Sequence, residues 1–362
     1  MKFLLPIFGL ILITSVLAVH KECSTRVKIN ARITKYGELI SVSKKPDNSS
    51  QTGCTRWIYM MNSHLSSIEA HAFNNDLQIK ELLINNLKKE LRLTQDSFAG
   101  LGQLDSLTIY STIISEDRRL FKHVGNITKL ELVIHESNAD IIGDSFTDLK
   151  NLKKLTIAES KTIATIDFAQ FFKAIPSIID LTFLYCETII MQSLAKASLK
   201  KLKQLNFLYS QIDHLTPGDF DGFTELESLS IISDVNNPNV INIQKNVFNN
   251  ITHLKKLRIQ YSGIIIQNNS FSRLYLDELD LSHNSFNVIK VNDKTFNGLG
   301  VDKLDLSFND NIVIQEGAFE KTTINTLYLI DTGITEDNDT SIWQFSHLPE
   351  IIFDLPQPTS LT

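Results

Sequence analysis

Apolar residues return along this chain in the pattern L-x-x-L-x-L, followed by a turn. The clearest copies are Leu276, Leu279 and Leu281, then Val301, Leu304 and Leu306, then Ile324, Leu327 and Leu329. Because side chains alternate along a strand, the last two apolar residues of each copy point to one side and the residue between them to the other. Each copy therefore predicts one short strand with one buried face.

The middle residue of the pattern marks the centre of each predicted strand. Successive centres are 22 to 28 residues apart, and most intervals are 23 to 25 residues. The centres are Ile58, Leu82, Leu107, Leu130, Leu155, Leu181, Leu205, Leu229, Leu257, Leu279, Leu304, Leu327 and Ile351. One such unit cannot bury its own apolar face, so repeats of this length stack on one another as a solenoid with parallel strands.

An aromatic residue precedes most strand centres by eight or nine residues. Phe is only 21 of 362 residues, so composition does not produce this coincidence. The set is Phe73, Phe98, Phe121, Phe146, Phe172, Phe220, Phe248, Phe271, Phe296, Phe319 and Trp343. We expect these rings to form a spine on the side of the coil away from the strands.

Three residues after the second strand leucine, most copies carry a side chain that can donate or accept a hydrogen bond. Buried turn backbone requires such partners. The column reads Ser63, Leu87, Thr112, His135, Ser160, Cys186, Ser210, Asp234, Ser262, Asn284, Asn309 and Thr332. We therefore interpret Cys186 and His135 as members of a hydrogen-bonding ladder, with Cys186 as a buried thiol, and not as site residues.

The repeats resemble the extracellular, phenylalanine-containing class of leucine-rich repeat proteins, such as Toll-like receptor ectodomains and secreted arthropod repeat proteins. The resemblance covers roughly residues 54–355. It implies an α/β solenoid shaped as a horseshoe, with about 13 strands in a parallel β-sheet on the concave face. It also implies that the usual activity is binding of a ligand or partner.

Two features depart from that family. Asparagine is rare in the ladder column, and no cysteine cluster follows the last repeat. Two explanations of the second departure stay open. The chain is truncated, or its uncapped C-terminal end is covered by another subunit, which would make the protein an oligomer.

The first residues predict a secretory signal peptide at 1–18. Lys2 precedes an apolar run, and Val16 and Ala18 occupy the small-residue cleavage positions. A retained signal anchor is the alternative. We expect residues 19–53 to form an N-terminal cap with a small hairpin in TRVKINARI and GELISVS, residues 54–355 the solenoid, and residues 356–362 a short tail.

Charge limits the partner classes, and the cysteines and glycan acceptors fit a secreted protein. Formal net charge is −6, from 35 Lys and Arg against 41 Asp and Glu, and the signs are well mixed, so neither nucleic acid nor an anionic membrane is implied as partner. Cys23 and Cys54 bracket the cap and should pair in an oxidising compartment. The expected glycan acceptors are Asn48, Asn126, Asn250, Asn268 and Asn338.

Motifs for catalysis are absent from the sequence. It contains no G-x-S-x-G, no H-E-x-x-H, no phosphate-binding glycine loop and no cysteine pair at zinc spacing. The nine histidines are scattered. We therefore expect no enzymatic activity, no cofactor and no metal.

The residues just after the second strand leucine predict a binding surface rich in apolar side chains and tyrosine. Neighbouring strands lie about 4.8 Å apart, so these positions should line up across the sheet, and tyrosine is favoured where partners bind. The candidates are Tyr110, Val133, Leu184, Tyr185, Leu208, Tyr209, Ile232 and Tyr261. For Leu184, Leu208 and Ile232, the first residues after the second strand leucine, packing into the turn is an alternative of equal weight.

Towards the C-terminus the outward strand positions become charged. Asp280 and Asp305 occupy the same position on consecutive strands, and Arg258 precedes them by one strand. Like charges directly opposite are mildly destabilising, and Arg258 can offset Asp280. A basic partner or a cation could bind there, but a solvated face with local ion pairs is the favoured interpretation.

Together these patterns predict a secreted, non-catalytic recognition protein. We expect it to hold an extracellular protein, peptide or glycan on the concave sheet, and the family resemblance suggests innate immunity or adhesion. The alternatives are a scaffold subunit resembling a receptor ectodomain, which acts through assembly, and an enzyme inhibitor.

Overall fold

A computed structural model describes residues 29–44, 57–61, 65–73, 78–161, 163–212, 214–286, 288–310 and 312–354. The chain divides into two compact units, Met1–Ile127 and Thr128–Thr362. The expected signal peptide, the pairing of Cys23 with Cys54, the acceptor Asn48 and the tail at 356–362 lie outside the described residues. They stay predictions, as do the boundaries of the cap and the solenoid.

The first strands that the structure describes form the predicted hairpin. Strand β1 (Ile29–Ile33) pairs antiparallel with β2 (Glu38–Lys44). Gly37 sits in the connecting turn with a φ of 89°, which a residue without Cβ adopts at little cost, and its N–H donates to the Thr34 carbonyl at 3.0 Å. The alternation in the two segments thus predicted their pairing correctly.

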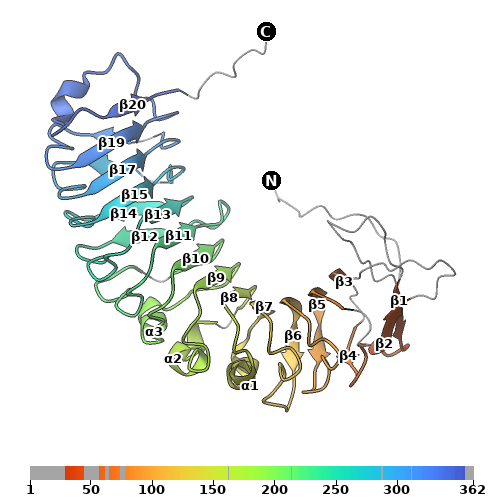
Figure 1. The fold of residues 1–362 in the computed structure, drawn as a ribbon. Coiled ribbons are helices and arrows are strands. Elements are labelled where there is room, and N and C mark those ends of the chain that lie inside the picture. The colour runs from red at the N-terminus through yellow and green to blue at the C-terminus, as the bar shows by residue number, and fades with distance from the viewer. Residues whose placement is uncertain are drawn as a thin grey trace, which may run out of the picture. The chain divides into compact units, whose positions relative to one another are not determined.

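Parallel strands complete the first unit (Figure 1). They are β3 (Trp57–Met61), β4 (Ser67–Ile68), β5 (Glu81–Arg92) and β6 (Ser106–Ile114). Ile58 lies opposite Leu82, and Leu82 lies opposite Leu107, so the three predicted strand centres are in register. All three side chains are buried.

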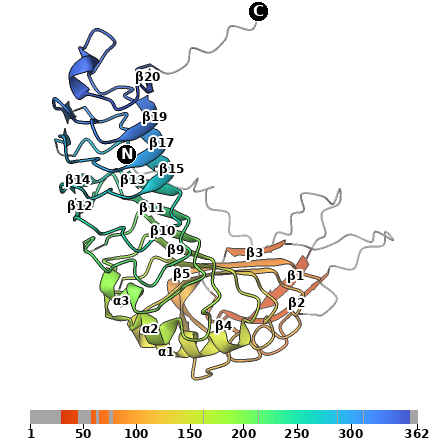
Figure 2. The same cartoon turned by 60° about the vertical axis from the view of Figure 1, so that its left-hand side comes forward.

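The second unit contains the longer run of parallel strands, which follow one another in sequence order (Figures 1 and 2). They are β7 (Lys129–Val133), β8 (Lys154–Ala158), β9 (Asp180–Leu184), β10 (Gln204–Leu208), β11 (Ser228–Ile232), β13 (Lys256–Gln260), β15 (Tyr275–Asp280), β17 (Gly300–Asp305), β19 (Thr323–Tyr328) and β20 (Glu350–Ile352). Leu181, for example, pairs with Leu155 and Leu205. Each predicted centre of this unit lies within one of these strands.

The opposite side of the second unit carries short elements. Helices α1 (Glu136–Ser145), α2 (Phe168–Phe171) and α3 (Met191–Ala195) lie there in both views (Figures 1 and 2). In the described part of this unit, 3-10 turns lie at Phe146–Asp148, Ile163–Thr165 and Thr340–Trp343. Two small parallel pairs join β12 (Val240–Ile243) to β14 (Gly263–Ile266) and β16 (Lys290–Val291) to β18 (Val313–Ile314). The architecture is therefore a parallel-strand solenoid with little helix.

The predicted aromatic spine runs through the core of the second unit. Phe248, Phe271 and Phe296 are almost fully buried, and their rings stack at centroid distances of 5.9 and 5.6 Å. Phe220 and Phe319 extend the stack at 5.8 and 6.0 Å. From Phe220 to Phe319, each coil therefore contacts the next through its ring as well as through its strand.

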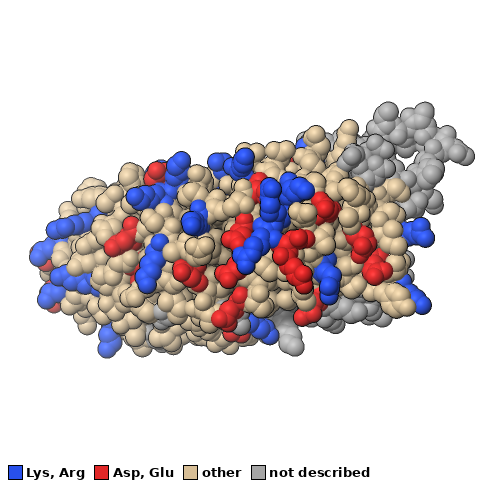
Figure 3. Space-filling model, turned by 90° about the horizontal axis from the view of Figure 1, so that it is seen from below, with Lys and Arg blue, Asp and Glu red and all other residues tan. Residues whose placement is uncertain are grey.

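The surface carries both charge signs. On the face drawn in Figure 3, Lys and Arg lie among Asp and Glu, with no broad area of one sign. Among the described residues, no helix has the length and hydropathy needed to cross a membrane. At the last described coil Leu348 is exposed and Ile351 is half-buried; assembly through this end stays a prediction.

Candidate recognition surface

Buried polar side chains form the predicted hydrogen-bonding ladder in the turns that follow the strands. The Nδ2 group of Asn284 donates to the carbonyls of Ile259 and Leu281 at 2.6 and 2.9 Å, and its Oδ1 accepts from the Ser262 N–H at 2.8 Å. Asn309 repeats this role, since its Oδ1 accepts from the Asn284 N–H at 2.7 Å. The ladder satisfies buried backbone groups and ties adjacent coils together.

Cys186 is a ladder member, as predicted. Its N–H donates to Ser210 Oγ at 3.0 Å, and its Sγ lies 3.3 Å from the Ile157 carbonyl oxygen. Burial raises the pKa of the Cys186 thiol to about 11, so the thiol stays protonated at neutral pH and is a poor nucleophile. His135 differs from the prediction: it stands before helix α1, where its N–H donates to Asn138 Oδ1 at 2.9 Å.

Asp234 was wrongly predicted as a ladder residue. Its Oδ1 accepts from the Asn236 N–H at 2.9 Å, within a turn that the Asn237 N–H closes onto the Asp234 carbonyl at 2.9 Å. Asn239 takes the ladder position instead, with Nδ2 donating to the Ser210 carbonyl at 2.9 Å. This repeat is the longest, at 28 residues, and the extra residues form the turn before the ladder residue.

At the position before the ladder residue, the backbone repeatedly adopts the left-handed conformation without glycine. The residues with their φ angles are Glu159 (48°), Tyr185 (52°), Tyr209 (52°), Tyr261 (55°), His283 (58°), Phe308 (58°) and Asp331 (52°). This conformation costs about 1–2 kcal/mol for most L-residues. It lets the Tyr185 N–H donate to the Leu208 carbonyl at 3.0 Å. The turn therefore requires the left-handed backbone at this position, but it does not require an aromatic side chain.

Five of these residues form what we term the aromatic column: Tyr185, Tyr209, Tyr261, His283 and Phe308. Tyr185 and Tyr209 stack at 4.9 Å with an interplanar angle of 16°. His283 stacks on Tyr261 at 5.0 Å and on Phe308 at 4.3 Å. Tyr185 and Tyr209 are 49% and 42% exposed, so this pair faces solvent, whereas Tyr261, His283 and Phe308 are half-buried.

Sequence reasoning found the three tyrosines of the aromatic column and missed His283 and Phe308. Both lie two residues after a second strand leucine, Leu281 or Leu306, which is the register that selected the tyrosines. The same rule carried two repeats further would have included them.

The apolar positions beside the column are only partly accessible. Leu184, Leu208 and Ile232 lie opposite one another on β9, β10 and β11, as predicted, and are half-buried. Val133 was wrongly placed on the exposed surface: it is buried, because the chain leaves β7 for helix α1 and Val133 packs in the core with Ile134. Tyr110 belongs to the first unit, where it is half-buried opposite Asn85.

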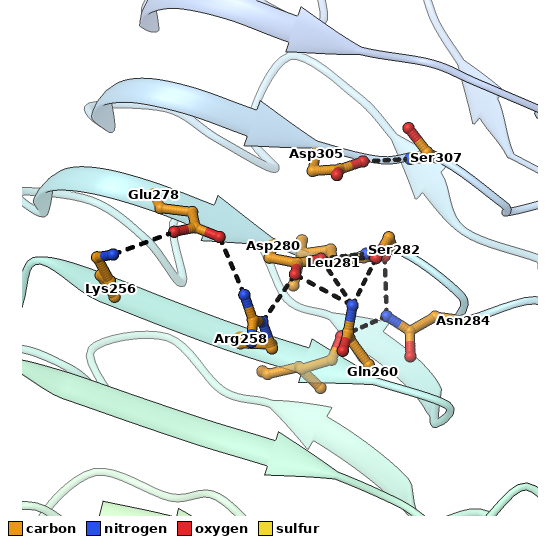
Figure 4. Close-up of polar contacts among 11 residues, drawn as sticks. Lys256, Arg258, Gln260, Glu278, Asp280, Leu281, Ser282, Asn284, Asp305 and Ser307 are labelled. Atoms are coloured by element: carbon orange, nitrogen blue, oxygen red, sulfur yellow. Dashed lines mark hydrogen bonds and ion pairs between the residues drawn. The ribbon is translucent and has the colours of Figure 1, made fainter. Parts of the chain in front are cut away.

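The charged positions near the C-terminus form a network of local ion pairs (Figure 4). Arg258 Nε donates to Asp280 at 2.8 Å, and its other guanidinium nitrogen donates to Glu278 at 3.2 Å. Gln260 Nε2 donates to Asp280 and to Ser282 Oγ, and Asp280 itself is buried. Because Asp280 is already neutralised and hydrogen-bonded, these contacts favour the interpretation of a face with local ion pairs over a free cation site.

Asp305 lies opposite Asp280 in register and has no such partner. It accepts from the Ser307 N–H at 2.9 Å, and no Lys or Arg of the described chain lies within ion-pair distance of it. Burial raises the pKa of Asp305, and the negative charge of Asp280 raises it further. Ionisation of Asp305 is therefore less favourable in the folded protein than in the unfolded chain.

We expect Asp305→Asn to increase the free energy of unfolding at pH 7. Because the pKa is raised, the wild-type free energy of unfolding declines as pH rises from the unfolded-chain pKa of about 3.9 through the higher folded-state pKa. Asparagine carries no charge and removes this decline, while its Oδ1 still accepts from the Ser307 N–H. Urea unfolding at pH 7 and pH 3 measures it: the gain should be present at pH 7 and small at pH 3. An equal gain in the exposed control Asp277→Asn, or a gain independent of pH, would contradict this explanation.

The predicted glycan acceptors lie outside the aromatic column. The acceptors Asn126, Asn250, Asn268 and Asn338 are all exposed, as glycosylation requires, and none belongs to the aromatic column. Among the residues that the structure describes, no group of three or more His, Cys, Asp or Glu is placed to hold a metal ion.

Solved structures with a similar chain path share little sequence. The Toll–Spatzle complex from Drosophila gives a TM-score of 0.49 and 13% identity, covering 86% of this chain and 48% of that chain. The TLR13–ssRNA13 complex gives 0.46 and 18%, covering 81% and 42%. An internalin from Listeria monocytogenes gives 0.46 and 16%, covering 85% and 92%. The chain thus spans about half of the length of the Toll chain.

Sequence comparison is more specific. A search of curated proteins found no significant match to the sequence. The family model for the BspA-type leucine-rich repeat region matches 6 copies, over residues 66–192 and 220–347. These stretches span more than half of the 362 residues and contain most of the strands and ladder residues described above. The chain therefore belongs to the family of proteins with BspA-type leucine-rich repeats.

Proposed function

We propose that this is a non-catalytic recognition protein that holds a partner against the aromatic column. The observation that supports the proposal is the two ring stacks, the exposed pair Tyr185–Tyr209 and the half-buried trio Tyr261–His283–Phe308, at positions where the backbone is left-handed. Glycine or asparagine would satisfy that backbone at lower cost. Strain of this kind concentrates at functional sites, which supports a binding role for the rings.

The chemistry of the column suits a binding surface. Tyrosine offers a large, rigid apolar area with a polar end, and it is enriched among the residues that dominate binding energy. The half-buried row of Leu184, Leu208 and Ile232 adds apolar area next to Tyr185 and Tyr209. The partner would then bury a contiguous surface across several coils.

The setting of this function is extracellular in our proposal. The apolar run behind Lys2 has the form of a secretory signal, and four exposed glycan acceptors are compatible with passage through the secretory route. A role in innate immunity or adhesion rests on family analogy alone. The partner classes are an extracellular protein, a peptide or a glycan.

Capture of the partner tests the role of the column. The protein is immobilised, exposed to native extracellular fluid, and the captured molecule is identified and purified. Tyr185→Ala, Tyr209→Ala and Tyr261→Ala are then combined in one variant. We expect capture of the purified partner to fall by at least about tenfold, because truncation of several binding residues costs more than about 1.4 kcal/mol.

A matched variant separates this effect from a general loss of exposed apolar area. Val240, Ile265 and Tyr275 are 74%, 50% and 81% exposed and lie outside the column. Their combined replacement by alanine should leave capture within about twofold of wild type. Unchanged capture by the folded tyrosine variant, or an equal loss in the control, would refute the proposed function.

A further inference from the structure

The first stacked pair of the aromatic column forms part of a hollow on the surface of the second unit. The hollow has a volume of about 320 Å³, and its lining includes Tyr185, Glu187, Tyr209, Gln211, Asp234 and Asn237. It lies where strands β9 and β10 leave the sheet, beside the turn that the longest repeat inserts at 234–237. Binding sites for drug-sized ligands range from about 300 to 1,000 Å³, so this hollow suits a single side chain or a small molecule.

The hollow is acidic. Glu187 and Asp234 contribute two carboxylates, and no Lys or Arg is among the lining residues. The carboxylate of Glu187 and the Oδ2 atom of Asp234 have no hydrogen-bond or ion-pair partner among the described residues. Burial raises the pKa of Tyr185, and the nearby Tyr209, Asp234 and Glu159 raise it further, as expected in a negative potential.

We propose that the hollow binds an arginine side chain of a protein partner, which packs against the tyrosine rings and donates to Glu187 and Asp234. This inference rests on the proposed function and names the chemistry of the partner. Cations are attracted to tyrosine rings, and the guanidinium group both stacks on aromatic residues and presents five N–H donors in a plane. Lysine offers only a compact charge on a flexible stem.

Charge complementarity is what favours arginine over a sugar. The hydroxyl groups of a neutral sugar can donate hydrogen bonds to the two carboxylates but leave both negative charges uncompensated, and partial burial of such charges is costly. A guanidinium group neutralises them while it occupies the hollow, and charge-assisted hydrogen bonds are stronger than neutral ones. The combination of rings with two carboxylates that have no ion-pair partner among the described residues therefore points to a basic residue on a protein.

Small probes test this inference apart from the natural partner. Nα-acetyl-arginine methylamide is titrated into the whole protein while the ring signals of Tyr185 and Tyr209 are followed by NMR. The matched probes are the corresponding citrulline amide, which has nearly the same shape without the charge, and methyl glucoside. We expect the arginine probe to shift both ring signals, to bind at least about tenfold more tightly than citrulline, and to weaken as salt rises.

Variants locate the binding in the hollow. Combining Glu187→Gln with Asp234→Asn should reduce affinity for the arginine probe by at least about tenfold, and asparagine at 234 can still accept from the Asn236 N–H. The control, Glu336→Gln with Asp337→Asn, makes the same charge change at two exposed residues of a distant coil and should have no effect. Equal binding of arginine and citrulline, shifts caused by methyl glucoside alone, or an arginine response that survives in the hollow variant would overturn the inference.

The two proposals fail separately. If capture of the natural partner depends on the tyrosines but the arginine probe does not bind, the aromatic column is a recognition surface and the arginine inference is wrong. If the arginine probe binds but the tyrosine variant captures the partner normally, the proposed function is wrong.

Discussion

Replacing Phe271 with alanine should lower the free energy of unfolding by about 3–5 kcal/mol. Its ring is fully buried, and it stacks on Phe248 at 5.9 Å and on Phe296 at 5.6 Å. In a solenoid each coil is stabilised by contacts with its two neighbours. The cavity left by Phe271→Ala therefore weakens two interfaces at once, as well as removing the buried apolar area of the ring.

Urea unfolding followed by far-UV circular dichroism measures this loss. The matched control is Phe286→Ala, because Phe286 is 46% exposed and lies outside the spine. We expect the control to cost less than about 1 kcal/mol, in the range of surface substitutions. Similar losses in the two variants would show that the ring stack is not a principal source of stability.

The second large effect is expected from the ladder. Asn284→Ala should cost about 2–5 kcal/mol, because it leaves the Ser262 N–H and the Ile259 carbonyl buried without their partners. The Leu281 carbonyl keeps a second donor, Asn309 Nδ2 at 3.0 Å, so its loss is smaller. Each unsatisfied buried group costs about 1–3 kcal/mol.

The same urea experiment tests this expectation. Asn249→Ala is the control, since Asn249 is exposed and its side chain makes no hydrogen bond among the described residues. Hydrogen exchange gives a second readout: the Ser262 amide, which donates to Asn284 Oδ1 in wild type, should exchange faster in Asn284→Ala. An Asn284→Ala variant as stable as the control, with unchanged Ser262 exchange, would show that the ladder satisfies backbone without adding stability.

Much of the fold could be predicted because its determinants repeat. A strand centre such as Leu205 sits in the same pattern as its neighbours, and a register error would move its whole apolar set to the wrong face. The phenylalanine spine was predictable for the same reason. The position of Asp234 in a turn could not be predicted, because the length of a repeat does not show where its extra residues lie. Val133 was misplaced because its burial depends on helix α1, which follows the strand and has no counterpart in most repeats.

The candidate site, too, could be predicted only in part. The register along the strands was enough to align Tyr185 with Tyr209. Their stacking and their left-handed backbone depend on the geometry of the turn, which the alternation of side chains along a strand does not describe. The hollow beside them also needs Glu187 and Asp234, from two different coils, and only the folded turn at 234–237 brings them to one place.

Hydroxyl-radical footprinting of the protein with its captured partner tests the central claim most directly. Tyr185, Tyr209 and Tyr261 should lose reactivity on binding, while Tyr36 and Tyr275, which are 70% and 81% exposed and lie outside the column, serve as internal references and should keep theirs. Protection of Tyr275 or Tyr36 with unchanged reactivity of the three column tyrosines would contradict recognition through the aromatic column.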